Sequence, residues 1–138
     1  MFGLLCRFAV VTRPRRRPVS PKARLLLKAL ESRIAPATFT VINTGDIGVG
    51  SGASGDLRYC ITQANAAGSA NVIDATGVSG TIRTNGVLTI ASSLTITGPA
   101  NNGLTINANG VDQVFTVTGT GRTVGFKNLN ITAGNTTK

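Results

Sequence analysis

The chain has 138 residues, enough for one domain with an appendage. It carries 14 Lys and Arg against 5 Asp and Glu, a formal net charge of +9. Nine of the basic side chains and one acidic side chain lie in residues 1–33, so the charge belongs to the N-terminal segment. The chain has no histidine and no tryptophan. This excludes a histidine general base, a Ser-His-Asp triad and zinc sites of the Cys/His type.

Residues 1–36 are predicted to form a basic, Pro- and Arg-rich tail that serves as a sorting segment. The apolar stretch of residues 2–11 precedes the arginine cluster of residues 13–17, which reverses the order of a secretory signal. No apolar run approaches the roughly 20 residues of a membrane helix, so no transmembrane span is expected.

Order within this tail is expected to change along the chain. Residues 1–21 are rich in Pro and Arg and cannot bury enough apolar surface to fold, so they are predicted to be disordered. Apolar residues four positions apart predict a short helix within residues 22–33, and Pro36 ends the pattern.

The next part of the chain predicts a strand, a loop and a helix. Alternating apolar residues over residues 38–44 predict the strand, and the glycines of residues 45–55 predict the loop. Residues 56–67 are predicted to be helical. The residues expected to cap this helix or to lie on its buried face are Ser54 or Asp56, Gly68, Leu57, Ile61 and Ala64.

Short runs of one form, apolar-Thr/Asn-apolar-polar-small, recur through the rest of the chain. They begin at Leu94, Leu104, Phe115 and Leu129. Aligning Ile73, Leu94 and Phe115 gives the same offset of 21 residues twice. A competing register pairs the runs at Leu104 and Leu129, an offset of 25 residues.

A repeat of about 21 residues with several short strands predicts a solenoid. Each turn would cover the apolar interior of the turn before it, and the helix of residues 56–67 would cap the first turn. In the 21-residue register, the inward rows would be Ile73, Leu94 and Phe115, then Ala75, Ile96 and Val117.

Several segments together resemble a known group of proteins. They are residues 38–45, 55–65, 71–74, 94–99 and 128–132, with the Leu-Glu-x-Arg-x-x-Pro pattern of residues 30–36 before them. Residues 37–138 thus resemble the start of right-handed parallel β-helix domains in large bacterial secreted and surface proteins, which are pectate-lyase-like or polymorphic-outer-membrane-protein-like.

This resemblance implies an all-β fold: a right-handed parallel β-helix of a few coils, with one N-terminal capping helix and a disordered basic tail. Residues 1–36 would be the tail, and residues 37–138 the cap and first coils. Members of that group commonly have many more coils, so residues 37–138 are expected to be truncated.

No catalytic, cofactor-binding or metal-ligating residue is predicted, and no cofactor is expected. Calcium sites and glycosidases need carboxylates that converge on one point, and the sequence shows no close pair. Arg58 and Lys127 could act as a base or an anion clamp, but we expect them on the exposed faces of the helix and of a coil. The carboxylates after the tail, expected in caps, turns and solvent-facing positions, are Asp46, Asp56, Asp74 and Asp112.

Three functions follow as hypotheses. The first is a non-catalytic structural or binding portion of an extracellular or cell-surface protein, with extracellular polysaccharide or cell-envelope components as partners. The second, implied by the resemblance, is a fragment of a β-helix polysaccharide lyase or hydrolase whose catalytic coils are absent. The third is nucleic-acid binding through the basic tail. It is disfavoured because no aromatic side chain interleaves with the arginines and no base-reading fold follows.

The last coil predicts self-association. Adding the 21-residue offset to Phe115 and Val117 reaches Thr136 and Lys138, so the next turn begins and is not completed. Unpaired strand edges and an uncovered core favour association between copies. The apolar side chains expected at this open end are Phe126, Leu129 and Ile131.

Overall fold

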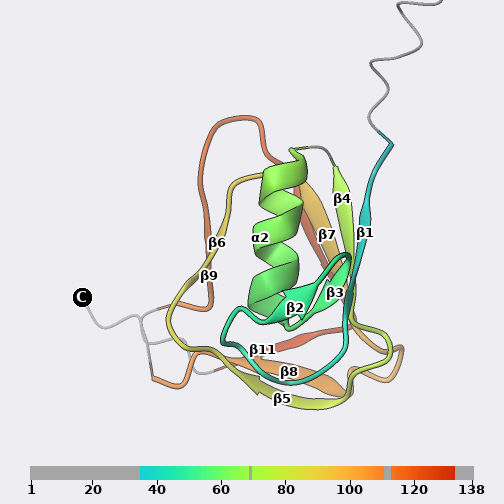
Figure 1. The fold of residues 1–138 in the computed structure, drawn as a ribbon. Helices are drawn as coiled ribbons and strands as arrows, with labels where there is room; N and C mark the ends of the chain where they lie inside the picture. Colours follow the sequence, from blue (N-terminus) through green and yellow to red (C-terminus); the bar gives the residue numbers. More distant parts are fainter. Residues whose placement is uncertain (1–34, 69, 111–112, 133–138) are drawn as a thin grey trace, which may run out of the picture. The chain divides into compact units, whose positions relative to one another are not determined.

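The structure is a computed structural model that describes residues 35–68, 70–110 and 113–132. Residues 34–138 make up one unit, distinct from residues 1–33. The predicted tail disorder and the short helix of residues 22–33 lie outside the described residues. The fold below is that of the second unit alone (Figure 1).

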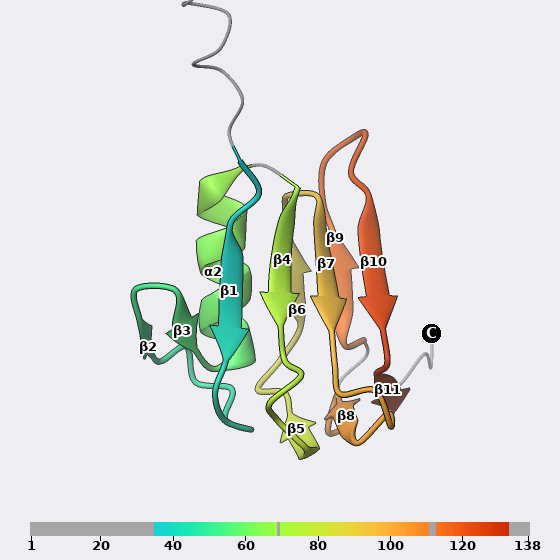
Figure 2. The ribbon, with the colours of Figure 1, turned by 90° about the vertical axis from the view of Figure 1, so that its right-hand side faces the viewer.

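Short strands in the described residues form three sheets. The six-stranded sheet has the order β10 (Val124–Lys127), β7 (Leu94–Thr97), β4 (Asn71–Asp74), β1 (Thr38–Val41), β3 (Ser54–Gly55) and β2 (Gly50–Ser51). The second sheet has the order β11 (Asn130–Thr132), β8 (Leu104–Asn107) and β5 (Gly80–Arg83). The third pairs β6 (Leu88–Ile90) with β9 (Phe115–Val117). Figure 2 shows the six-stranded sheet from one face, with β10 and β2 at its opposite edges.

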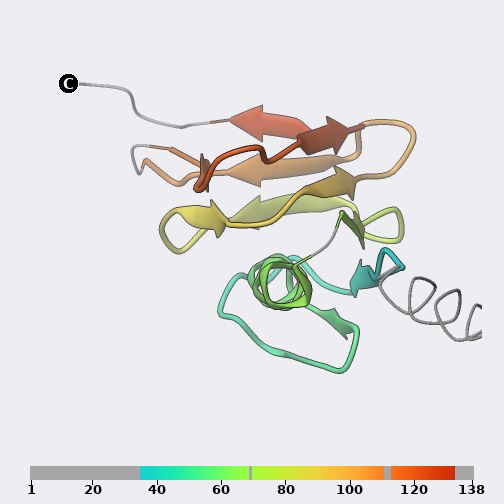
Figure 3. The same ribbon diagram turned by 90° about the horizontal axis from the view of Figure 1, so that it is seen from above.

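Successive strands from β4 onward belong to the three sheets in turn. It passes through β4, β5 and β6, then through β7, β8 and β9, and then through β10 and β11. Each pass lies beside the one before it, so neighbouring strands are parallel, apart from the antiparallel pair β2–β3. Seen from above, the passes lie in layers, with β10 and β11 at one end and the segment containing β2 and β3 at the other (Figure 3).

Alternation of side chains places the core between the sheets. In β1, β4, β7 and β8 every second residue is buried, because successive side chains of a strand point to opposite faces. Strands of two to four residues are not stable alone, so this shared apolar interior holds them together. The largest fully buried apolar side chains include Leu57, Ile73, Ile82, Leu88, Ile90, Ile96, Leu104 and Ile106.

Helix α2 (Leu57–Ala67) forms as the sequence predicts. Asp56 is its N-cap, with a side chain that accepts a hydrogen bond from the Tyr59 N–H at 2.8 Å. Gly68 ends it in the left-handed conformation, with φ of 69°, which glycine adopts without steric cost. The buried side chains of the helix are Leu57, Cys60, Ile61 and Ala64.

The helix covers the edge of β6. The Asn65 side chain donates to the Thr89 carbonyl at 2.9 Å and accepts from the Ala91 N–H at 2.8 Å. These are hydrogen bonds that a neighbouring strand would otherwise make. Asn65 of α2 therefore covers this edge of β6, and Figure 3 shows the helix beside this part of the layers.

The predicted loop of residues 45–55 contains a small hairpin instead. Gly50 pairs with Gly55 in the antiparallel ladder of β2 and β3, and the Tyr59 ring lies directly over both glycines. A Cβ atom at either position would collide with that ring. The preceding strand also ends earlier than predicted, at Val41 and not at residue 44.

The prediction of an all-β, right-handed parallel β-helix is wrong. The unit has mixed sheets, because β2 pairs antiparallel to β3 at the edge of the largest sheet. An 11-residue helix supplies part of the core, and the strands are short. The physical reason is that residues 45–67 fold locally, into a hairpin and a helix, and these contribute to the same core as the strands.

The 21-residue register is also wrong. Ile73 pairs with Ile96, 23 positions later, and Leu94 pairs with Val124, 30 positions later. Phe115 lies in a different sheet, opposite Leu88. The competing offset of 25 residues is confirmed, since β8 and β11 pair with that spacing. Turns of unequal length connect the strands, so no single period describes the chain.

Candidate functional site

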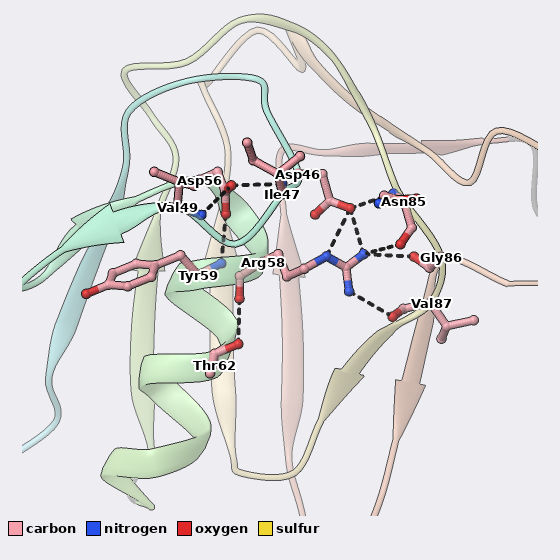
Figure 4. Close-up of polar contacts among 10 residues, drawn as sticks. All are labelled: Asp46, Ile47, Val49, Asp56, Arg58, Tyr59, Thr62, Asn85, Gly86 and Val87. Atoms are coloured by element: carbon pink, nitrogen blue, oxygen red, sulfur yellow. Dashed lines mark hydrogen bonds and ion pairs between the residues drawn. The ribbon is translucent and has the colours of Figure 1, made fainter.

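A polar cluster joins α2 to two loops (Figure 4). The Arg58 guanidinium forms an ion pair with Asp46, with 2.6 Å between Arg58 Nη2 and Asp46 Oδ2 and 3.2 Å between Arg58 Nε and the same oxygen. Arg58 also donates to the carbonyls of Asn85, Gly86 and Val87, at 3.1, 3.0 and 3.3 Å. The Asn85 N–H donates to Asp46 Oδ2 at 2.6 Å. Arg58 therefore binds the chain just before β6, where β5 leads into it.

The Arg58 side chain is less exposed than the sequence suggests. It was expected on the exposed face of the helix, but its side chain is 28% exposed, and that of Asp46 is 1% exposed. Asp46 Oδ1 is buried and has no hydrogen-bond partner in the described part of the chain. The guanidinium is thus engaged by the carboxylate and three carbonyls, an arrangement that fixes chain segments and leaves Arg58 no role as a base.

Asp56 organises the loop before the helix. Its Oδ2 accepts from the N–H groups of Ile47 and Val49, at 3.0 and 2.9 Å, while Oδ1 caps α2. Burial acts to raise the pKa of Asp56, but the backbone N–H donors of Tyr59, Val49 and Ile47 outweigh it and hold that pKa below its usual value. The ionised carboxylate therefore stabilises the loop and the start of the helix.

This lowered pKa predicts acid sensitivity. A carboxyl whose pKa is lower in the folded state stabilises the fold above its unfolded pKa, near 3.8, and loses that contribution as the pH falls through the folded value. We expect Asp56→Asn to lower the free energy of unfolding at pH 7, and the difference from the natural chain to shrink between about pH 5 and pH 2. Urea unfolding across this range measures it. A difference that stays constant with pH would contradict the assignment.

The other candidate residues have separate, local roles. Asp74 accepts from the Thr76 hydroxyl at 2.7 Å and from its N–H at 2.9 Å, and these bonds lower the pKa of Asp74. Asp74 is the last residue of β4 and bonds to the turn that follows the strand. Lys127 is exposed on β10, as predicted, and Asp112 lies outside the described residues. In the described ranges, no group of three or more His, Cys, Asp or Glu side chains could hold a metal ion.

Cys60 is a buried, free thiol on α2. Burial raises the pKa of Cys60 to about 11. The Sγ atom lies 3.4 Å from the Thr40 carbonyl. A thiol with so high a pKa is protonated at neutral pH and is a poor nucleophile, so Cys60 acts as a core residue.

The strongest candidate for a functional surface is the end of the layers formed by β9, β10 and β11. Rows of apolar residues that are buried in inner strands become exposed there. Ile96 is 0% exposed and its partner Phe126 is 39% exposed. Ile106 is 0% exposed and its partner Ile131 is 45% exposed. Ile90 is 0% exposed and its partner Val117 is 48% exposed. We call the exposed set of Val117, Phe126 and Ile131 the β9–β11 surface.

Backbone groups at this surface are also available. Each of β9, β10 and β11 is the outermost strand of its sheet, paired on one side only within the described residues. The strands carry one charged side chain, that of Lys127. Edge strands usually avoid association through charges, proline or bulges, and this end has one lysine for three strands.

A second exposed apolar group lies at the other end of the layers. Ile42, Ile47 and Val49 are 61%, 76% and 61% exposed, and we call them the loop patch. They flank the hairpin: the Ile42 N–H donates to the Gly55 carbonyl, and Val49 directly precedes β2. Ile47 and Val49 lie in the segment predicted to be a loop and Ile42 lies in the predicted strand of residues 38–44, and no binding role was predicted for either segment.

The sequence predicted only part of the β9–β11 surface and did not predict the loop patch. The apolar residues Phe126 and Ile131 were expected at an exposed end, and this is confirmed, but Leu129 is packed against the core.

The described residues contain no helix of sufficient length and hydropathy for a membrane span. No family model, curated protein or solved structure matches the chain, so its resemblance to secreted surface proteins stays a prediction.

Proposed function

We propose that the unit of residues 35–132 is a non-catalytic structural module that self-associates through the β9–β11 surface. One observation carries this proposal: Val117, Phe126 and Ile131 are 39–48% exposed at this end, whereas the residues with which they pair in the neighbouring strands are 0% exposed. A second copy would bury Val117, Phe126 and Ile131, as the chain's own next layer buries Ile90, Ile96 and Ile106.

The energetics favour such an association. Burying apolar surface contributes about 25 cal/mol for each Å² removed from water. Pairing an edge strand satisfies its unpaired backbone groups at the same time. Residues 34–138 carry five basic and four acidic side chains, so copies of this unit repel each other little.

The polar cluster supports a structural role over a catalytic one. Arg58, Asp46 and Asp56 are occupied in fixing the loop and the helix, through the contacts given above. We extend the proposal to location at the cell surface, supported by the sequence resemblance and the basic tail. Assembly of many copies is a function suited to that location.

Sedimentation velocity of the full chain tests the proposal. At physiological salt, where charges are screened beyond about 8 Å, we expect the average mass to rise from micromolar to tens of micromolar protein. Phe126→Lys and Ile131→Lys should each shift the distribution towards monomer, because a lysine at an apolar contact must be desolvated. Thr62→Lys, on an exposed position of α2, is the matched control and should associate like the natural chain.

Two results would overturn this proposal. One is a monomeric natural chain at tens of micromolar that unfolds cooperatively. The other is association that Phe126→Lys and Ile131→Lys leave unchanged. Circular dichroism melts of each variant separate lost association from lost folding.

A further inference from the structure

We infer that the copies join head to tail: the β9–β11 surface of one copy binds the loop patch and the β2 edge of the next. This inference rests on the proposed self-association and names its second surface. It assigns a binding role to Ile42, Ile47 and Val49, which the fold itself leaves in solvent.

The distribution of exposed apolar side chains is the first argument. The large apolar residues exposed in the described chain fall into two groups of three, the loop patch and the β9–β11 surface. The two groups lie at opposite ends of the layers, beside β2 and beside β10 and β11 (Figures 2 and 3). With two apolar surfaces at opposite ends, the β9–β11 surface of each copy can cover the loop patch of the next copy. A molecule with one such surface could form only a pair.

The edges of the six-stranded sheet are the second argument. β10 and β2 are its two outermost strands. β2 runs opposite to the other five, since it is antiparallel to β3 while those strands are parallel. When two copies have the same orientation, β10 of one therefore meets β2 of the next in antiparallel fashion. Such a pair continues the sheet from copy to copy with ordinary ladder hydrogen bonds.

The third argument is that the loop patch is held in place. Asp56 Oδ2 fixes the N–H groups of Ile47 and Val49. Asp46, next to Ile47, points into the ion pair with Arg58, as Figure 4 shows. A surface that is already ordered loses little conformational entropy on binding. The polar cluster therefore holds the apolar side chains of Ile47 and Val49 at the surface in a fixed position.

The other edges restrict the geometry. α2 covers the edge of β6 through Asn65, so the two-stranded sheet cannot be extended from that side. The six-stranded sheet, by contrast, has an edge strand beside each of the two exposed apolar groups. A head-to-tail contact uses different surfaces on the two partners. Unless the copies close into a ring, it generates an open chain of copies.

A complementation experiment tests this inference with the full chain. Phe126→Lys blocks the β9–β11 surface, and Ile47→Lys blocks the loop patch at its most exposed position. In a head-to-tail assembly, each variant alone should be monomeric. A mixture should form one-to-one pairs, in which the loop patch of the Phe126→Lys copy binds the intact β9–β11 surface of the Ile47→Lys copy. Sedimentation with a fluorescent label on one variant at a time measures this, and Thr62→Lys is again the control.

The outcomes separate this inference from the proposed function. If the contact instead joined two β9–β11 surfaces, Ile47→Lys would associate like the natural chain and the mixture would form no pairs of the two variants. That result overturns the head-to-tail contact and leaves self-association standing. A monomeric natural chain overturns both. Two monomeric variants that do not pair when mixed, although circular dichroism shows both folded, also overturn the head-to-tail contact.

Discussion

Replacing Leu57 by alanine should lower the free energy of unfolding by about 2–5 kcal/mol, the range for removing a buried leucine side chain. Leu57 is 0% exposed at the first turn of α2, and the helix packs against β1, β4 and β6. The substitution leaves a cavity in the core to which Leu57 belongs. Chemical unfolding of the full chain, followed by circular dichroism, measures the change.

Thr62→Ala is the matched control for this prediction. Thr62 lies on the same helix but is exposed, so its truncation should change the free energy of unfolding by less than about 0.5 kcal/mol. If Leu57→Ala were as mild as the control, α2 would not be part of the core, and its role as a cover for the β6 edge would fail with it.

Replacing Arg58 by methionine should destabilise the fold by about 3 kcal/mol, because it leaves a buried charge without its partner. Methionine keeps an unbranched apolar side chain but removes the guanidinium. The Asp46 carboxylate would then retain the Asn85 N–H as its hydrogen-bond donor, while its other oxygen is already buried without a partner in the described chain. The carbonyls of Gly86 and Val87 would lose their Arg58 hydrogen bonds as well.

The double variant Asp46→Asn with Arg58→Met tests the cause. Asparagine removes the charge, so the double variant should be less destabilised than the sum of the two single variants. Unfolding free energies of the four proteins in this cycle give the coupling between the two side chains. A coupling near zero would show that Arg58 stabilises the fold through the carbonyls alone.

The helix and its caps could be predicted because they depend on residues close together in the sequence. The spacing of Leu57, Ile61 and Ala64 gives one apolar face, and this face is buried. Asp56 precedes the helix and Gly68 follows it, and both act as the caps expected of these residue types. Alternation within a strand is equally local, so the buried positions of β1, β4, β7 and β8 follow from their own residues.

The polar cluster shows why the candidate site could not be predicted. Arg58 reaches the carbonyls of residues 85–87, which lie 27 or more positions away. Nothing in the residues around position 85 distinguishes this turn from the other Asn-Gly turns of the chain. Only the packing of α2 beside β6 brings the guanidinium there.

The sequence by itself determined the helix of residues 56–67 with its caps, the alternation that buries every second residue of β1, β4, β7 and β8, and that Phe126 and Ile131 lie at an exposed end. The tertiary structure alone decided which strands share a sheet, their offsets, and the hairpin of β2 and β3. The reason is that the runs beginning at Leu94, Leu104 and Phe115 are nearly the same in pattern but belong to three sheets. A strand's pattern fixes its two faces, whereas its neighbours depend on turn lengths and on side chains that meet only after the chain has folded.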